Sequence, residues 1–160
     1  GYSTMTRPED ISERAWEGVR LYIDCEFNGW MGELISFAMV SDDGQEFYSV
    51  LPEPRTWDKW CFENVFPVLG KKPVASAADF RVAFFAFLHG FRNPIIVADW
   101  PADLYYFNKV LLGTGHEESI LYPCRMELVP CDIASATPHN ALADARAIRD
   151  TIAAIRSPHV

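Results

Sequence analysis

Three segments near the start of the chain have the hydrophobic pattern of β-strands. Residues 20–27 (RLYIDCEF), 33–40 (ELISFAMV) and 45–50 (QEFYSV) are rich in β-branched and aromatic residues. Residues 41–44 (SDDG) lie between the last two segments and are typical of a hairpin turn. The pattern therefore predicts an antiparallel meander of three strands.

Beyond residue 50 the pattern changes to helices alternating with short strands. Helices are predicted over four segments, 57–69, 76–88, 101–112 and 137–155. Two short apolar runs, 95–98 and 126–131, predict two further strands. The order of elements predicts an α/β fold, in which a mixed sheet combines the antiparallel meander with parallel strands and has helices on its faces.

The bulk composition indicates one globular domain. The 160 residues are 49% hydrophobic and 22% charged, which is close to the usage of globular proteins. We expect a single domain over 19–160 and an N-terminal extension over 1–18, whose residues 1–4 precede Met5 and look like a cloning remnant. No apolar run approaches the ~18 residues that span a bilayer, so no membrane partner is expected.

The cysteines indicate the cellular compartment, and the net charge limits how the protein could contact nucleic acid. None of Cys25, Cys61, Cys124 and Cys131 belongs to a C-x-x-C pair, which favours reduced thiols in a cytoplasmic protein without a secretory signal. The net charge of −8 argues against a protein that coats nucleic acid along its length, because phosphate contacts need Lys and Arg. It does not exclude an enzyme that holds only a strand end, since bound divalent metals reverse the local charge.

Asp24 and Glu26 are the first candidate functional residues. Residues i and i+2 of a strand share a face, so these two acids point the same way while Ile23 and Cys25 point the other way. Like charges side by side destabilise a strand unless a cation lies between them, and Mg²⁺ or Mn²⁺ prefers carboxylate oxygens. Two solvated acids on an exposed face are the alternative interpretation.

His139 and Asp144 lie at the start of the last predicted helix. Asp144 sits at the edge of its apolar stripe and therefore faces the sheet, where a carboxylate needs a metal or a partner such as a nearby Arg. Within one regular helix the two side chains would be about 140° apart. They converge if His139 lies in the loop and the helix starts near Asn140, which we favour over an earlier start at Thr137-Pro138. A solvated or capping histidine is the alternative.

A third acidic position lies where the apolar run 95–98 turns into the following helix. Asp99 ends the strand and Asp103 lies on the first helical turn, where acids also occur simply as helix caps. Either carboxylate can face the other acids, and Asp103 is the preferred candidate.

Taken together, these motifs resemble the DEDD-type 3′-5′ exonucleases of the histidine subgroup, which have a ribonuclease H-like fold. The resemblance rests on Asp-x-Glu in the first strand, an Asp at a strand-to-helix turn, and the His-x4-Asp of residues 138–144 (PHNALAD). Residues 22–50 look most like small bacterial and phage-type exoribonucleases. The family pattern implies two Mg²⁺ or Mn²⁺ ions held by Asp24, Glu26, Asp103 and Asp144, with His139 as general base.

The resemblance also implies a substrate and a partner. The expected activity is release of nucleoside 5′-monophosphates from the 3′ end of single-stranded RNA, with Glu26 and the backbone after it sensing the 2′-hydroxyl. Phe27 and Trp100 flank the proposed ligands and are candidates to stack on a terminal base, with core packing as the alternative. A homodimer is expected by analogy. A DNA-directed exonuclease, an endonuclease of ribonuclease H type and a catalytically inert nucleic-acid-binding module remain alternatives.

Overall fold

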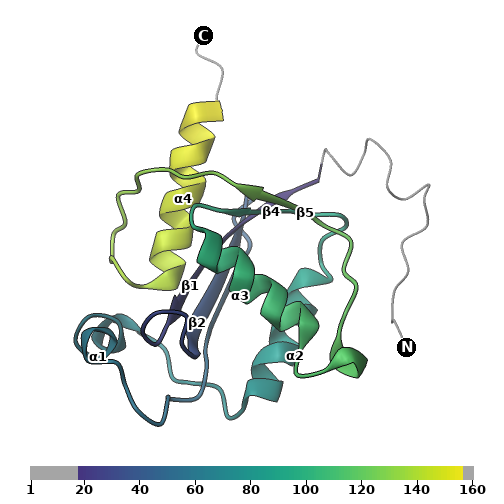
Figure 1. Ribbon diagram of the computed structural model, residues 1–160. Coiled ribbons are helices and arrows are strands. Elements are labelled where there is room, and N and C mark those ends of the chain that lie inside the picture. Colours follow the sequence, from purple (N-terminus) through teal and green to yellow (C-terminus); the bar gives the residue numbers. More distant parts are fainter. Residues whose placement is uncertain (1–17, 157–160) are drawn as a thin grey trace.

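The computed structural model describes residues 18–156 (Figure 1). Apart from Gly18, the expected extension over 1–18 lies outside the described residues. The strands are β1 (Arg20–Phe27), β2 (Leu34–Ser41), β3 (Glu46–Val50), β4 (Ile95–Ala98) and β5 (Arg125–Leu128). The helices are α1 (Lys59–Asn64), α2 (Ala77–Leu88), α3 (Pro101–Leu112) and α4 (Ala141–Arg156), with short 3-10 helices η3 (Phe66–Val68) and η4 (His116–Glu118).

The five described strands form one mixed sheet in the order β3-β2-β1-β4-β5. β1, β2 and β3 pair antiparallel, whereas β4 runs parallel to both β1 and β5. The predicted α/β class, with an antiparallel meander joined to parallel strands and flanked by helices, is therefore confirmed. β1 is the central strand, so the acids that it carries lie in the middle of the sheet.

Helices cover both faces of the sheet (Figure 1). On one face, Leu21, Ile23 and Cys25 of β1 pack in a core with the phenylalanines of α2 and α3. On the other face, Tyr22 packs in a second core with Ile148 and Ile152 of α4. The alternation of β1 therefore sends its even-numbered residues toward α4, because successive side chains of a strand point to opposite faces. Within residues 18–156, no helix has the length and apolar character needed to cross a membrane.

The helix predicted over 57–69 was wrong in its extent. α1 begins after Asp58, whose side chain accepts a hydrogen bond from the Cys61 backbone N–H at 3.1 Å, and it ends at Asn64. Pro67 has no N–H to donate, and its ring clashes with the carbonyl four residues earlier, so the α-helix cannot continue. The chain forms the 3-10 helix η3 there instead.

The strand predicted over 126–131 was also too long at its C-terminal end. β5 ends at Leu128, and one further backbone hydrogen bond runs from Val129 N to Ala98 O at 2.8 Å. Pro130 follows and has no N–H with which to continue the ladder.

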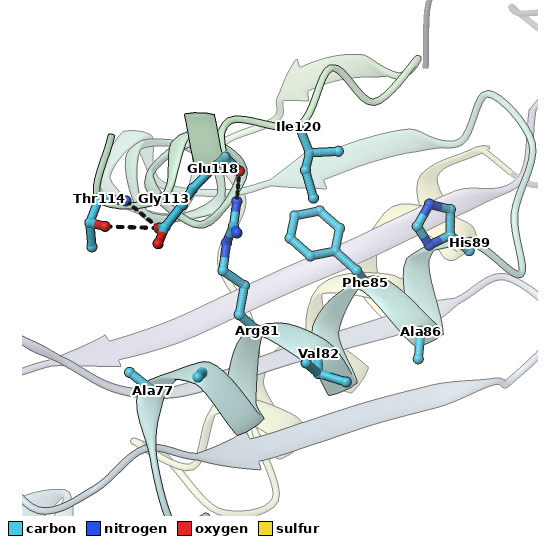
Figure 2. Close-up of a pocket in the computed structure, with 11 residues that line it drawn as sticks. Ala77, Arg81, Val82, Phe85, Ala86, His89, Gly113, Thr114, Glu118 and Ile120 are labelled. Carbon is cyan, nitrogen blue, oxygen red and sulfur yellow. Dashed lines mark hydrogen bonds between the residues drawn. The ribbon is translucent and has the colours of Figure 1, made fainter. Parts of the chain in front are cut away.

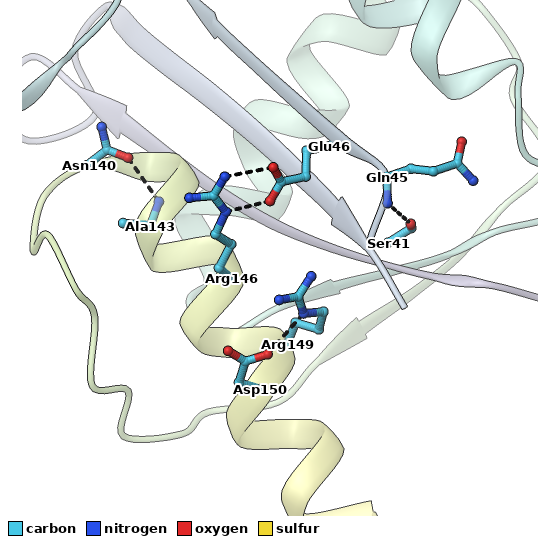
Figure 3. A network of polar contacts seen from close by, with 8 residues as sticks. All are labelled: Ser41, Gln45, Glu46, Asn140, Ala143, Arg146, Arg149 and Asp150. Atoms are coloured by element: carbon cyan, nitrogen blue, oxygen red, sulfur yellow. Dashed lines mark hydrogen bonds and ion pairs between the residues drawn. The ribbon is translucent and has the colours of Figure 1, made fainter. Parts of the chain in front are cut away.

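α4 begins at Ala141, directly after Asn140, as the later of the two predicted start sites requires. The Asn140 side-chain oxygen accepts a hydrogen bond from the Ala143 backbone N–H at 2.9 Å, as an N-cap does (Figure 3). Further along the helix, the Arg146 guanidinium forms two hydrogen bonds to the Glu46 carboxylate of β3, including one of 2.7 Å from Nη2 to Oε1 (Figure 3). These contacts attach α4 to the meander half of the sheet.

Candidate metal centre

The structure brings together the carboxylates of β1 and α4 that the sequence singled out. One oxygen each from Asp24, Glu26 and Asp144 lie within 4.8 Å of one another. The Oδ2 atom of Asp24 is buried and has no hydrogen-bond partner among the described residues. A buried carboxylate oxygen without a donor is costly, so its surroundings fit a bound cation.

A second set of three carboxylates also includes Asp24. Oxygens of Asp24, Asp99 and Asp103 also lie within 4.8 Å of one another. Asp99 follows β4 and Asp103 lies on the first turn of α3, so the strand-to-helix turn supplies both. The sequence posed them as alternatives, and the structure brings both to Asp24.

Asp103 is the more firmly held of these two acids. Its side chain is 2% exposed, and its Oδ1 atom accepts hydrogen bonds from the backbone N–H and from the thiol of Cys25, each at 3.1 Å. Cys25 points away from Asp24 and Glu26 on the strand, yet its backbone N–H fixes a third acid beside them. Because Oδ1 takes both hydrogen bonds, Oδ2 is the oxygen of Asp103 that is free of them.

Burial and mutual repulsion raise the pKa of every carboxyl group in the two sets. Burial raises the pKa of Glu26 to about 8, with Asp144 and Asp103 adding to it. Burial also raises the pKa of Asp103 to about 7, against the hydrogen bonds from Cys25 that lower it. The pKa of Asp24 lies well above its usual range because of burial and then the nearby Asp103, Glu26, Asp144 and Asp99. Burial is likewise the main cause of the raised pKa of Asp99 and Asp144.

No arginine of the described chain neutralises Asp144. The two arginines next to it on α4 are occupied elsewhere, since Arg146 pairs with Glu46 and Arg149 pairs with Asp150 (Figure 3). Asp144 therefore does not pair with a nearby arginine, which was the alternative to a metal site. Its half-buried carboxylate belongs to the set that it forms with Asp24 and Glu26.

His139 lies in the turn before α4, with a left-handed φ of 71°. Such a φ is uncommon for a non-glycine residue, and the contacts of Asn140 hold the turn in place. Asn140 Nδ2 donates to the Val68 carbonyl of η3 at 2.8 Å, while its Oδ1 caps α4. The imidazole meets the ring of Trp60 edge-on, with centroids 4.9 Å apart.

The two aromatic residues proposed from the sequence differ in their surroundings. Phe27 is partly buried and stacks on Tyr106, with centroids 4.7 Å apart, so packing accounts for one face of its ring. Trp100 is 53% exposed at the start of α3. Sequence reasoning missed Trp60, which is 51% exposed and touches His139. Its contact joins residues 79 positions apart in the sequence, and no local pattern indicates it.

A cavity of about 650 Å³ lies away from the carboxylates, between α2 and residues 113–120 (Figure 2). Its polar side chains are occupied by structural contacts. Arg81 Nε donates to the Val110 carbonyl at 3.0 Å, and the Glu118 carboxylate accepts from the backbone N–H and hydroxyl of Thr114 at 2.9 and 2.8 Å. This cavity contains none of the candidate metal ligands.

No protein-family model matches the chain, and the search of curated proteins found no significant match. Five carboxylates form two sets that share Asp24, and the half-buried His139 with the exposed Trp60 lies at the start of the helix that carries Asp144. Such an arrangement can hold two divalent cations beside an imidazole.

Proposed function

We propose that this chain is a metal-dependent 3′-5′ exoribonuclease that releases nucleoside 5′-monophosphates from the 3′ ends of single-stranded RNA. The observation that carries the proposal is that Asp24 belongs to both carboxylate sets and has a buried oxygen without a partner. A carboxylate shared by two cation sites is what a two-metal centre requires. The order β3-β2-β1-β4-β5 supports a ribonuclease H-like fold for the domain.

The residues present fit Mg²⁺ or Mn²⁺. Both ions take oxygen ligands, and the two sets offer carboxylate oxygens only. Asp24, Glu26 and Asp144 would hold one ion, and Asp24 with Asp103 would hold the other, with Asp99 within reach of the same set. When bound, such ions stabilise the attacking and the leaving oxygen of an in-line displacement at phosphorus.

The chain itself would supply proton transfer and positioning. His139 is held beside the carboxylates by the Asn140 contacts and would accept the proton of the attacking water. Phe27, Trp60 and Trp100 offer aromatic faces for a terminal base. The Glu26 side chain and the backbone after it would recognise the 2′-hydroxyl, a donor and acceptor that DNA lacks. The chain would act in the cytoplasm, where its four free cysteines stay reduced.

A time course with oligonucleotides labelled at either end tests the reaction. With Mn²⁺ present, a 5′-labelled RNA should shorten stepwise while a 3′-labelled RNA should release labelled mononucleotide at once. Internal fragments at early times would indicate an endonuclease. Binding of the strand without cleavage would indicate an inert binding module.

A matched pair of ribo and deoxy strands tests the choice of substrate. We expect faster cleavage of the ribo strand, because a site that hydrogen-bonds the 2′-hydroxyl leaves polar groups unpaired on DNA. Comparable rates would make the protein a general single-strand exonuclease. Faster digestion of DNA would favour the DNA-directed alternative.

A further inference from the structure

One side of the candidate metal centre carries aromatic side chains that the fold leaves in solvent. Trp30 is 81% exposed, Phe62 is 49% exposed and Phe66 is 42% exposed. Phe62 and Phe66 stack on each other, with centroids 5.3 Å apart and planes inclined by 15°. Rings of this size normally bury most of their surface, so several exposed rings in one region indicate a binding surface.

Hydrogen bonds join the β1–β2 loop, which carries Trp30, to the segment around α1. The Asn28 side chain donates to the Thr56 carbonyl at 2.7 Å and accepts from the Asp58 backbone N–H at 2.7 Å. The N–H of Gly29 points to the sulfur of Cys61 at 3.4 Å. The β1–β2 loop and the segment around α1 therefore form one connected surface.

The same region reverses the charge of an acidic protein. Residues 51–73 contain four basic and three acidic residues and therefore have a net charge of +1. Since the net charge of the whole chain is −8, the other residues together carry −9. The basic residues are exposed, and they are Arg55, Lys59, Lys71 and Lys72. No carboxylate in the described part of the chain pairs with any of these four. Together with Trp30, Phe62 and Phe66 they define what we call the aromatic–basic rim.

The rim is continuous with the candidate metal centre. α1 carries Phe62 and also Trp60, whose ring contacts His139. The Asn140 side chain binds the Val68 carbonyl of η3, which joins the other end of this segment to the turn before α4. A cavity of about 280 Å³ opens within the rim, and Trp57, Phe66, Lys71 and Lys72 are among the residues that line it.

We infer that the aromatic–basic rim binds the nucleotides that precede the terminal one in a single strand. Aromatic faces accept any base, and lysine and arginine neutralise the backbone phosphates, which is how sequence-tolerant single-strand sites work. The inference rests on the proposed function, since it takes the metal centre as the place where the 3′ end lies. The four exposed basic residues beside exposed aromatic rings, in a chain whose net charge is otherwise negative, favour a nucleic-acid strand over a protein partner as the occupant.

The experiment compares two substrates, a ribodinucleotide that fills only the metal centre and a dodecaribonucleotide that also reaches the rim. Two double variants are used, Lys71→Glu with Lys72→Glu, and Phe62→Ala with Phe66→Ala. Lys109→Glu on α3 is the matched charge control, because Lys109 is exposed and lies over Tyr105 outside the rim. Melting temperatures establish that each variant is folded.

We expect the wild-type kcat/KM to be higher for the dodecamer than for the dinucleotide. The phenylalanine variant should reduce that ratio about tenfold or more, because one lost stacking contact costs this much in binding. The lysine variant should also reduce the ratio, because it replaces two phosphate contacts by two negative charges. The lysine variant should also flatten the salt dependence of dodecamer binding by roughly 1.4 in log–log slope. Lys109→Glu should leave the ratio close to the wild-type value.

Three outcomes would overturn the inference. The first is that the wild type has equal kcat/KM for both substrates. The second is that the rim variants keep the wild-type ratio. The third is that the wild type is a dimer, which the rim variants convert to a monomer while dodecamer binding is unchanged. The last outcome would make the rim an interface between copies of the chain. If the wild type cleaves neither substrate, the proposed function fails, and fluorescence anisotropy of a labelled dodecamer still decides whether the rim binds single strands.

Discussion

Glu26→Gln should remove much of the pH dependence of stability in the metal-free protein. Burial and the neighbouring acids raise the pKa of Glu26 from 4.5 to about 8 in the folded chain. A group whose pKa is raised by folding stabilises the native state below its unfolded pKa, and this stabilisation is lost as the pH rises through the folded pKa. The stability of the apo protein should therefore fall between about pH 4.5 and pH 8.

The size of the effect follows from the two pKa values of Glu26. A difference of one between folded and unfolded pKa corresponds to ~1.36 kcal/mol. Between pH 5 and pH 8, ionisation of Glu26 should lower the free energy of unfolding by on the order of 3 kcal/mol. Glutamine has nearly the shape of the protonated carboxyl group and cannot ionise. Glu26→Gln should therefore match the wild type at pH 5 and be more stable than the wild type at pH 8 by about that amount.

Urea denaturation in EDTA at pH 5 and pH 8 measures both free energies. Glu33→Gln is the control, because Glu33 is an exposed carboxylate in the β1–β2 loop, outside both acidic sets. Its stability should follow that of the wild type at both pH values. Glu26→Gln could instead lose stability between pH 5 and pH 8 as steeply as the wild type does. Folding would then not raise the pKa of Glu26, and the proposed cause of the pH dependence would be refuted.

Three further predictions concern the metals, the base and the turn that holds it. Millimolar Mn²⁺ should raise the melting temperature, since it binds only the folded state, and Asp24→Asn should remove most of the rise; an equal rise in the variant would place the metal elsewhere. His139→Ala should lower the rate by roughly 10²–10⁴-fold with the Mn²⁺ effect intact, and wild-type turnover would make the histidine structural. Asn140→Asp keeps the oxygen that caps α4 but loses the N–H that donates to the Val68 carbonyl. We therefore expect urea denaturation to show a loss of stability of about 1 kcal/mol, and we expect a lower kcat at similar KM. An unchanged kcat would show that the turn holds without this contact.

Local patterns were sufficient to predict much of the candidate site. The alternation of β1 predicts that Asp24 and Glu26 share a face, and the start of α4 near Asn140 places His139 in a turn. The ends of α1 and β5 are set by prolines, which the pattern of hydrophobic residues does not take into account. Pro67 divides the expected helix, and Pro130 ends the ladder of β5.

Contacts between distant segments could not be predicted in the same way. Asp99 and Asp103 occupy one strand-to-helix turn, and only the position of α3 against β1 brings both to Asp24. Trp60 lies in a stretch whose apolar residues are typical of an ordinary core-facing helix, so its contact with His139 required the fold. The charge of residues 51–73, in contrast, is visible by counting charge along the chain in windows instead of over its whole length.

The register of β1 links the fold to the proposed chemistry. A slip by one residue would turn Asp24 and Glu26 into the core of α2 and α3 and would present Cys25 to α4, because the side-chain period of a strand is two. The native pairing of Asp24 with Ala38 and of Cys25 with Phe37 also leaves the Cys25 N–H free to hold Asp103. The acids of β1 and α3 thus take their positions only when the central strand is correctly paired. Metal binding should accordingly require the native sheet, so that the repulsion stored among the carboxylates is relieved by cations only in the folded protein.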